Sequence, residues 1–155
     1  MTNDQNAHEH AMVWAGDKPD GQPVHEVVPV ERLPDGRYKI VGTPAMVLGC
    51  AAGDIVVFDQ NKRVQVLQRG GNLAVQAFPV VELVPTDVGR LREAMTPLGG
   101  LVESPPDLRF VVVTVPVTAG FPRVESIMDE WAAEANANWW YGNVEDDEGA
   151  LLNWW

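Results

Sequence analysis

Residues 73–95 read LAVQAFPVVELVPTDVGRLREAM, and within this stretch the chain changes from a strand pattern to a helix pattern. The run 73–83 is apolar and extended in character, which is typical of a strand. Thr86 or Asp87 can then cap a helix. The apolar side chains that follow recur at helical spacing: Val88, Leu91 and Met95. This stretch therefore predicts a strand that leads directly into a helix.

The rest of the second half repeats the alternation of strands and helices. A short strand is predicted at 101–103, a buried, β-branched strand at 108–115 and a last strand at 137–144. A second helix should start at Pro122. One apolar stripe runs along it: Val124, Ile127, Met128, Trp131 and Ala135. The order β-α-β-β-α-β is that of the ferredoxin-like unit, whose two helices cover one face of the sheet. The other face is left to bind something or to pack on the N-terminal half.

The first half consists of short extended runs separated by turns. Strands are predicted at residues 12–14, 24–33, 37–41, 55–58 and 63–69. The sequence Pro34-Asp35-Gly36 is a strong turn signal, and Pro29 argues that its strand lies at an edge or carries a bulge. Short strands at this spacing predict a small antiparallel barrel or a strongly bent sheet.

The chain is therefore expected to be an α+β protein. An N-terminal β-barrel lobe over residues 10–72 packs on a C-terminal ferredoxin-like lobe over residues 73–155, and the two are rigidly joined or form one domain. With 155 residues, of which 46% are hydrophobic, the chain is long enough to bury a core.

The middle of the chain resembles a known family. Residues 42–56 read GTPAMVLGCAAGDIV, in which a proline segment leads to a loop of small residues and then to a Gly-Asp strand start. The strand at 63–68, the Gly70-Gly71 turn and the acidic turn 145–149 fit the same layout. Through these features the chain resembles an uncharacterised bacterial family, domain of unknown function 4265. The resemblance covers about residues 12–152. Because that family has no assigned activity, the resemblance implies architecture and not function.

The charge balance limits the classes of partner. Eleven basic and 22 acidic residues give a net charge of -11, which opposes binding to nucleic acid or to anionic lipid. A run of about 18 apolar residues, as a membrane span needs, is absent from the sequence. The N-terminus lacks the basic region of a secretory signal, and Cys50 has no second cysteine to pair with. These features predict a protein of the reducing cytoplasm.

Aromatic and acidic residues gather at the C-terminal end. The last 32 residues hold five of the six tryptophans and eight carboxylates, and the last basic residue is Arg123. Tryptophan is enriched in binding hot spots, and an acidic field favours basic partners. The candidate partner-binding residues are Trp139, Trp140, Tyr141, Glu145, Asp146, Asp147 and Glu148.

Each tryptophan must be weighed against a core role. Trp131 lies on the apolar stripe and should be core. Trp139 and Trp140 are neighbours on a predicted strand, so they point to opposite faces and one of them meets the other lobe, solvent or a partner. Trp154 and Trp155 either pack back onto the barrel or form an exposed apolar patch.

Metal and catalytic motifs are weak in this sequence. His8, Glu9 and His10 could hold a metal, but a polar chain terminus is the simpler interpretation. His25 and Glu26 look like surface residues, and Cys50 like a buried, inert thiol. The Gly49–Gly53 loop precedes a strand, whereas a phosphate loop precedes a helix. The run 145–148 lacks the spacing of a calcium loop. No catalytic residue, metal or cofactor is therefore expected.

These features favour a non-enzymatic interaction protein. In its concrete form, it is a bacterial immunity or antitoxin-type protein that neutralises a basic toxin domain by plugging a cationic site. One alternative is a small-molecule sensor that uses the free sheet face or the groove between the lobes. Another is an enzyme with Cys50 or a carboxylate at its site. An apolar sheet face would also invite a two-fold homodimer.

Overall fold

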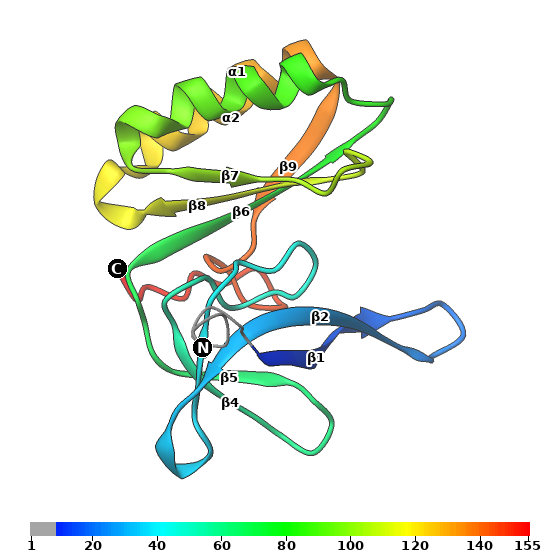
Figure 1. The fold of residues 1–155 in the computed structure, drawn as a ribbon, viewed down its shortest axis with the longest axis vertical. Helices are drawn as coiled ribbons and strands as arrows, with labels where there is room; N and C mark the ends of the chain where they lie inside the picture. Colours follow the sequence, from blue (N-terminus) through cyan, green and yellow to red (C-terminus); the bar gives the residue numbers. More distant parts are fainter. Residues whose placement is uncertain (1–8) are drawn as a thin grey trace, which may run out of the picture.

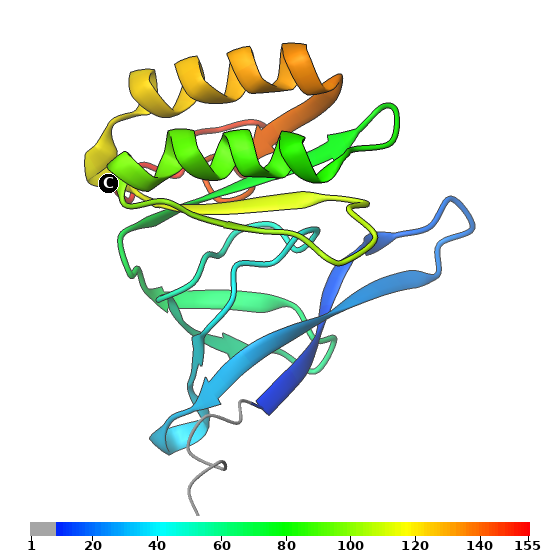
Figure 2. The same cartoon turned by 45° about the horizontal axis from the view of Figure 1, so that its top comes forward.

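The computed structural model describes residues 9–155, which form two antiparallel sheets and two α-helices. Figures 1 and 2 show three layers: the two helices, a four-stranded sheet beneath them, and a five-stranded sheet below that. The predicted α+β class is therefore confirmed. Of the three residues considered above for a metal, His8 lies outside the described residues, and Glu9 and His10 begin the first strand.

The strands of the first sheet follow one another in chain order across it. They are β1 (Glu9–Asp17), β2 (Pro23–Arg32), β3 (Tyr38–Ile40), β4 (Ile55–Phe58) and β5 (Val64–Gln68). A 3-10 turn, Pro34–Gly36, joins β2 to β3 where the sequence predicts a turn. A small core gathers on one face of this sheet: Val13, Val28, Val30, Ile40, Val47, Cys50 and Val56.

Over residues 9–155 this sheet is open, so the closed barrel, one of the two predicted forms, is not present. Within residues 9–155, β1 pairs only with β2, and β5 pairs only with β4. The Trp14 N–H of β1 donates to the carbonyl of Lys62, in the turn before β5, at 2.8 Å. Closure would need a ladder between β1 and β5, but the β1–β2 hairpin projects away from the other strands (Figure 1).

Pro29 lies inside the sheet and not at its edge, since β2 runs between β1 and β3. The ladder between β2 and β3 starts with Val30 opposite Ile40, one residue past the proline. The missing N–H of Pro29 therefore falls where that ladder has ended. Its carbonyl still accepts the N–H of Val41 at 3.0 Å. The prediction of an edge strand is therefore wrong. An inner strand can hold a proline at a position where the neighbouring strand needs no backbone N–H from it.

The second sheet has the strand order β7-β8-β6-β9. Its strands are β6 (Asn72–Pro79), β7 (Leu101–Glu103), β8 (Val111–Pro116) and β9 (Ala137–Tyr141). The helices are α1 (Pro85–Met95) and α2 (Phe121–Ala135), and 3-10 turns lie at Thr96–Leu98 and Val117–Ala119. Along the chain the order is β6-α1-β7-β8-α2-β9, which is the predicted order of strands and helices.

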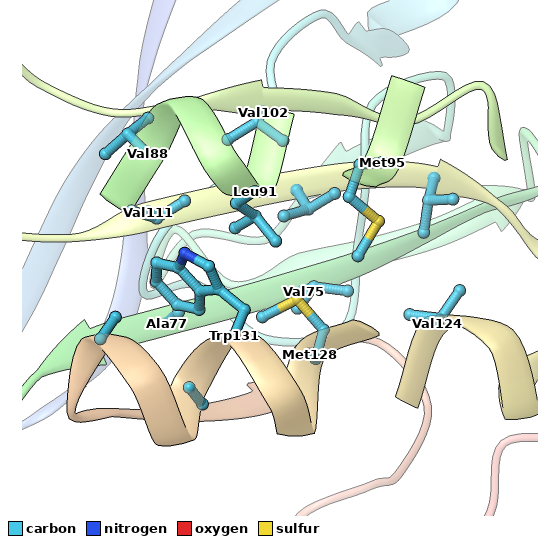
Figure 3. Close-up of a cluster of buried hydrophobic side chains, with 14 of the residues drawn as sticks. Val75, Ala77, Val88, Leu91, Met95, Val102, Val111, Val124, Met128 and Trp131 are labelled. Atoms are coloured by element: carbon cyan, nitrogen blue, oxygen red, sulfur yellow. The ribbon is translucent and has the colours of Figure 1, made fainter. Parts of the chain in front are cut away.

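The main core lies between this sheet and the helices. Alternation along β6 sends Leu73, Val75 and Ala77 towards the helices and Ala74 and Gln76 to the opposite face. The helices contribute the side chains that the sequence placed on their apolar stripes, among them Leu91, Met95, Met128 and Trp131 (Figure 3). Trp131 is 4% exposed, which confirms its predicted core role.

Local geometry moves some boundaries from their predicted places. Helix α1 already begins at Pro85, and the carboxylate of Asp87 accepts the N–H of Val84 at 2.9 Å. Asp87 thus caps the helix from inside its first turn, while Thr86 makes no cap bond. Strand β8 begins at Val111, three residues later than predicted, because Leu108 has a left-handed φ of 56° within a turn.

The segment 41–54 lies between the two sheets and is bonded to both (Figure 2). From the first sheet, the Glu26 carboxylate accepts the backbone N–H groups of Ala45, Met46 and Val47 at 2.7, 2.8 and 2.9 Å. From the second sheet, the Gln76 amide donates to the carbonyls of Pro44 and Val47, each at 3.0 Å. Glu26 is therefore an anchor of this loop, and the prediction of a merely surface residue is wrong.

Candidate functional site

Strand β9 lies at one edge of the second sheet. Helix α2 ends at Ala135, and the next residue, Asn136, has a φ of 56° and a ψ of 60° that turn the chain back into β9. Residues 137–141 then pair with β6 from Pro79 to Val75. Within residues 9–155 no further strand pairs with β9, so its second side is open. This edge carries Trp139, Trp140 and Tyr141, the predicted aromatic part of the site.

Trp139 and Tyr141 point towards helix α2. The indole N–H of Trp139 donates to Asp129 at 2.9 Å, and the Tyr141 hydroxyl donates to Glu125 at 3.0 Å. The two rings meet edge to face, with centroids 5.1 Å apart. Burial, together with the bond to the Glu125 carboxylate, raises the pKa of Tyr141 above its ordinary value, so its hydroxyl stays protonated.

Trp140 points to the opposite face and remains 43% exposed. Its ring stacks on Phe78 at a centroid distance of 5.4 Å and an angle of 11°. Its indole N–H donates to the side-chain oxygen of Gln76 at 2.8 Å. The prediction that the two neighbouring tryptophans point apart is therefore confirmed. Trp140 is the exposed one, and these two contacts hold its ring in place.

A hollow of about 230 Å³ lies at the edge of β9. It is lined by Trp139, Trp140, Tyr141, Val144 and Glu145. The structure thus brings one residue of the acidic run together with the three aromatic residues. Because the aromatic side chains leave the strand on both faces, a hollow that touches all of them runs along the strand edge itself.

The acidic turn that follows is only partly available to a partner. One carboxylate oxygen of Asp146 accepts the N–H groups of Glu148 and Ala150, each at 2.9 Å, so this side chain builds the turn. Asp147 is exposed and lines a different hollow of about 240 Å³, together with Trp14, Arg63 and others. The predicted site therefore divides into Glu145 beside the aromatics, a structural Asp146, and Asp147 facing the first sheet.

The two C-terminal tryptophans pack on the molecule. The Trp154 indole N–H donates to the Asn143 carbonyl at 2.8 Å, and the guanidinium of Arg69 lies 5.3 Å from its ring centroid. Trp155 meets Phe121 edge to face at 5.1 Å and stays partly exposed. Gln76 and Phe78, which support Trp140, were missed from sequence. A glutamine on an otherwise apolar strand was the signal available for the first of them.

Cys50 and Asp54 form a buried polar cluster rather than a reaction centre. Cys50 is 1% exposed, and burial raises the pKa of its thiol to about 12. Burial also raises the pKa of Asp54, whose carboxylate accepts the N–H groups of Ala51 and Gly70 at 2.9 and 2.8 Å. A thiol of this kind is a poor nucleophile, and the carboxylate holds the Gly49–Gly53 loop in shape.

Two features are absent from the described part of the chain, a cluster of metal-binding side chains and a membrane-spanning helix. Residues 9–155 contain no group of three histidine, cysteine, aspartate or glutamate side chains placed to hold a metal ion. None of the helices there has both the length and the apolar character that a membrane crossing needs.

Comparison with known proteins supports the fold and assigns the family. No curated protein matches the chain. A solved structure described as "Novel crystal structure of a hypothetical protein from Neisseria gonorrhoeae" has a TM-score of 0.66 and 19% identity, covering 94% of this chain and 96% of that one. This likeness shows the fold alone. A model of the family described as "Domain of unknown function (DUF4265)" matches residues 26–139, short of Trp140 and the acidic turn. With that match over most of its length, the chain belongs to this family, as residues 42–56 predicted.

Proposed function

We propose that this protein is a non-enzymatic binding protein that recognises a basic protein partner. The recognition surface comprises the edge of β9 and the exposed carboxylates after it. In the more specific form of the proposal, the protein is an immunity or antitoxin-type inhibitor that covers a cationic site on a toxin domain. Buried Cys50 and structural Asp54 offer no reaction centre that would favour an enzyme instead.

Trp140 is the observation that carries this proposal. Its ring is 43% exposed, yet it is fixed by Phe78 on one side and by Gln76 at its N–H. A large ring that is already immobile loses little conformational entropy when a partner covers it. Rigid aromatic anchors of this kind are typical of binding hot spots. The exposure of Trp140 therefore favours a binding role over a purely structural one.

The acidic residues that follow Trp140 in the chain support a basic partner. The carboxylates of Glu145, Asp147 and Glu148 are exposed, and the chain has no basic residue after Arg123. The whole chain carries a net charge of -11. Such a field accelerates association with a positively charged partner and weakens as salt is added.

We also infer that the second half is a ferredoxin-like lobe and that the protein works in the cytoplasm. The first inference is supported by the strand order β7-β8-β6-β9 with both helices on one face (Figure 2). The second is supported by the single cysteine, Cys50, which is kept as a buried free thiol.

The test compares two double charge reversals that change the net charge equally. Asp147→Lys with Glu148→Lys alters the proposed surface, whereas Glu31→Lys with Glu82→Lys alters exposed positions on β2 and in the β6–α1 connection. Each protein serves as bait in native lysate, and association rates are then measured with the purified captured protein at low and at high salt. We expect the first variant to slow association by about tenfold and to reduce its salt dependence. Equal effects of the two variants would refute the assigned surface.

A further inference from the structure

We propose that the partner binds through an extended segment that adds to β9 as a fifth strand of the second sheet. A lysine or arginine side chain of that segment occupies the hollow beside Trp140 and Glu145. This inference rests on the proposed function and specifies how recognition occurs. It follows from the backbone of β9, the position of the hollow and the charge at this edge.

The hydrogen-bond alternation of β9 leaves backbone groups facing outwards. The Gly142 N–H donates to Ala74 at 2.8 Å, and the Asn136 carbonyl accepts from Val80 at 2.9 Å. In an antiparallel ladder, bonded positions alternate with positions whose N–H and C=O point away. Counting inwards from these two bonds, Asn138 and Trp140 bond to β6, and Ala137, Trp139 and Tyr141 point their backbone groups to the open side. Strand addition uses free groups of this kind.

The hollow lies where a side chain of an added strand would reach. It is lined by aromatic side chains from both faces of β9 and by Glu145, and its volume is about 230 Å³. A cation there can lie against the Trp140 ring and pair with the Glu145 carboxylate. On the helix side, Asp129 and Glu125 already accept bonds from Trp139 and Tyr141, so they add negative potential without being free ligands.

The two edges of this sheet differ in how they are protected. The opposite edge strand, β7, has only three residues and is followed by Pro105 and Pro106, features that discourage pairing. β9 has the sequence Ala-Asn-Trp-Trp-Tyr, with no proline, lysine or other charged residue. Its edge therefore lacks the usual devices that block strand addition.

The charge of the protein favours one kind of binding partner for the β9 edge. A second copy of the chain would bring another net charge of -11 and the same carboxylates, which is repulsive. A basic segment gains from both the backbone bonds and the field. A partner segment of that chemistry is therefore favoured over the homodimer that the sequence left open.

The test follows single amides by NMR hydrogen exchange. The probe is a short acetylated peptide of alternating lysine and valine, and its control is the same peptide with alternate backbone amides methylated. In the free protein the amides of Trp139 and Tyr141 should exchange fast and those of Asn138 and Trp140 slowly. Saturating probe should slow the first pair by about tenfold or more, and the methylated peptide should not.

A variant pair tests the hollow. Glu145→Gln should weaken binding of the probe by about three- to tenfold, whereas Glu82→Gln at an exposed site elsewhere should leave it unchanged. Strand addition is overturned if the probe fails to bind, if it binds without slowing exchange at Trp139 and Tyr141, or if these amides are protected in the free protein by self-association. None of these results decides the proposed function, which stands or falls with the captured partner and the charge reversals.

Discussion

At the scale of single residues, Gln76 connects the two sheets to the proposed surface. It is 0% exposed, and its amide bonds to the carbonyls of Pro44 and Val47 and to the indole of Trp140. Leaving a buried polar group without a hydrogen-bond partner destabilises the folded state by more than a typical hydrogen bond stabilises it. One side chain thus fixes both the loop between the sheets and the orientation of the exposed tryptophan.

Replacing Gln76 should therefore affect stability strongly. We expect Gln76→Leu to lower the free energy of unfolding by about 2–4 kcal/mol, because it leaves two carbonyls and an indole N–H without partners. Gln65→Leu, at an exposed position of β5, should change it by less than about 0.5 kcal/mol. Urea unfolding followed by tryptophan fluorescence measures both. Similar small effects would show that water replaces the Gln76 bonds at no cost.

The thiol of Cys50 makes a prediction about pH. Its pKa is raised from 9.0 to about 12 in the folded protein, so between these values the unfolded chain loses the proton first. The folded state then binds more protons, and stability must fall as pH rises through this window. The part of the fall that comes from the thiol should be missing in Cys50→Ala, as urea unfolding across the window would show.

Alkylation supplies an independent check on Cys50. Native protein should react with iodoacetamide only as fast as the loop opens, since the thiol is buried and protonated. The double variant Cys50→Ala with Ala133→Cys, which puts a thiol on an exposed position of α2, should react quickly. Fast reaction of the native Cys50 would reopen the possibility of a nucleophile.

At the scale of elements, the acidic turn combines structural and exposed carboxylates. Asp146 accepts two backbone N–H groups, whereas within residues 9–155 no such bond involves the Asp147 carboxylate. We expect Asp146→Ala to speed amide exchange at Glu148 and Ala150 by about fivefold, equivalent to about 1 kcal/mol. Asp147→Ala should leave both rates unchanged. Exchange measured by NMR on the two variants decides the point, and equal rates would mean that the turn holds without Asp146.

At the scale of the whole molecule, the two sheets should behave as one folding unit. The hydroxyls of Thr43 and Thr114 lie 2.6 Å apart across the boundary, and the Asn72 amide donates to the Ala52 carbonyl at 2.9 Å. These contacts bind strands of the second sheet to the segment 41–54, which the Glu26 carboxylate in turn holds to the first sheet.

We therefore expect the full chain to unfold in a single calorimetric transition. A fragment of residues 73–155 should not persist as a folded monomer, because it uncovers the face of the second sheet that holds Ala74, Gln76 and Val112. Size-exclusion chromatography and circular dichroism of the fragment test this. A monomeric fragment with native spectra would show that residues 73–155 are an independent domain.

The local sequence determined the elements and the faces they bury. The helical stripe from Val124 to Ala135 predicts correctly which face of α2 packs on the core, because helix and strand periods are local properties of the backbone. The same reasoning shows that Trp139 and Trp140 point apart. The resemblance carried by residues 42–56, 63–71 and 145–149 also predicted the family correctly.

Only the tertiary structure decided which of these elements and side chains contact one another. That the first sheet stays open, that Glu26 anchors a distant loop, and that Phe78 and Gln76 immobilise Trp140 all depend on residues far apart in the chain. The different roles of the acidic residues likewise depend on the path of the turn. Asp146 accepts backbone N–H groups within the turn, whereas Glu145 lines the hollow beside β9. Sequence periodicity fixes the direction of a side chain, but its partners are set by how the chain packs in three dimensions.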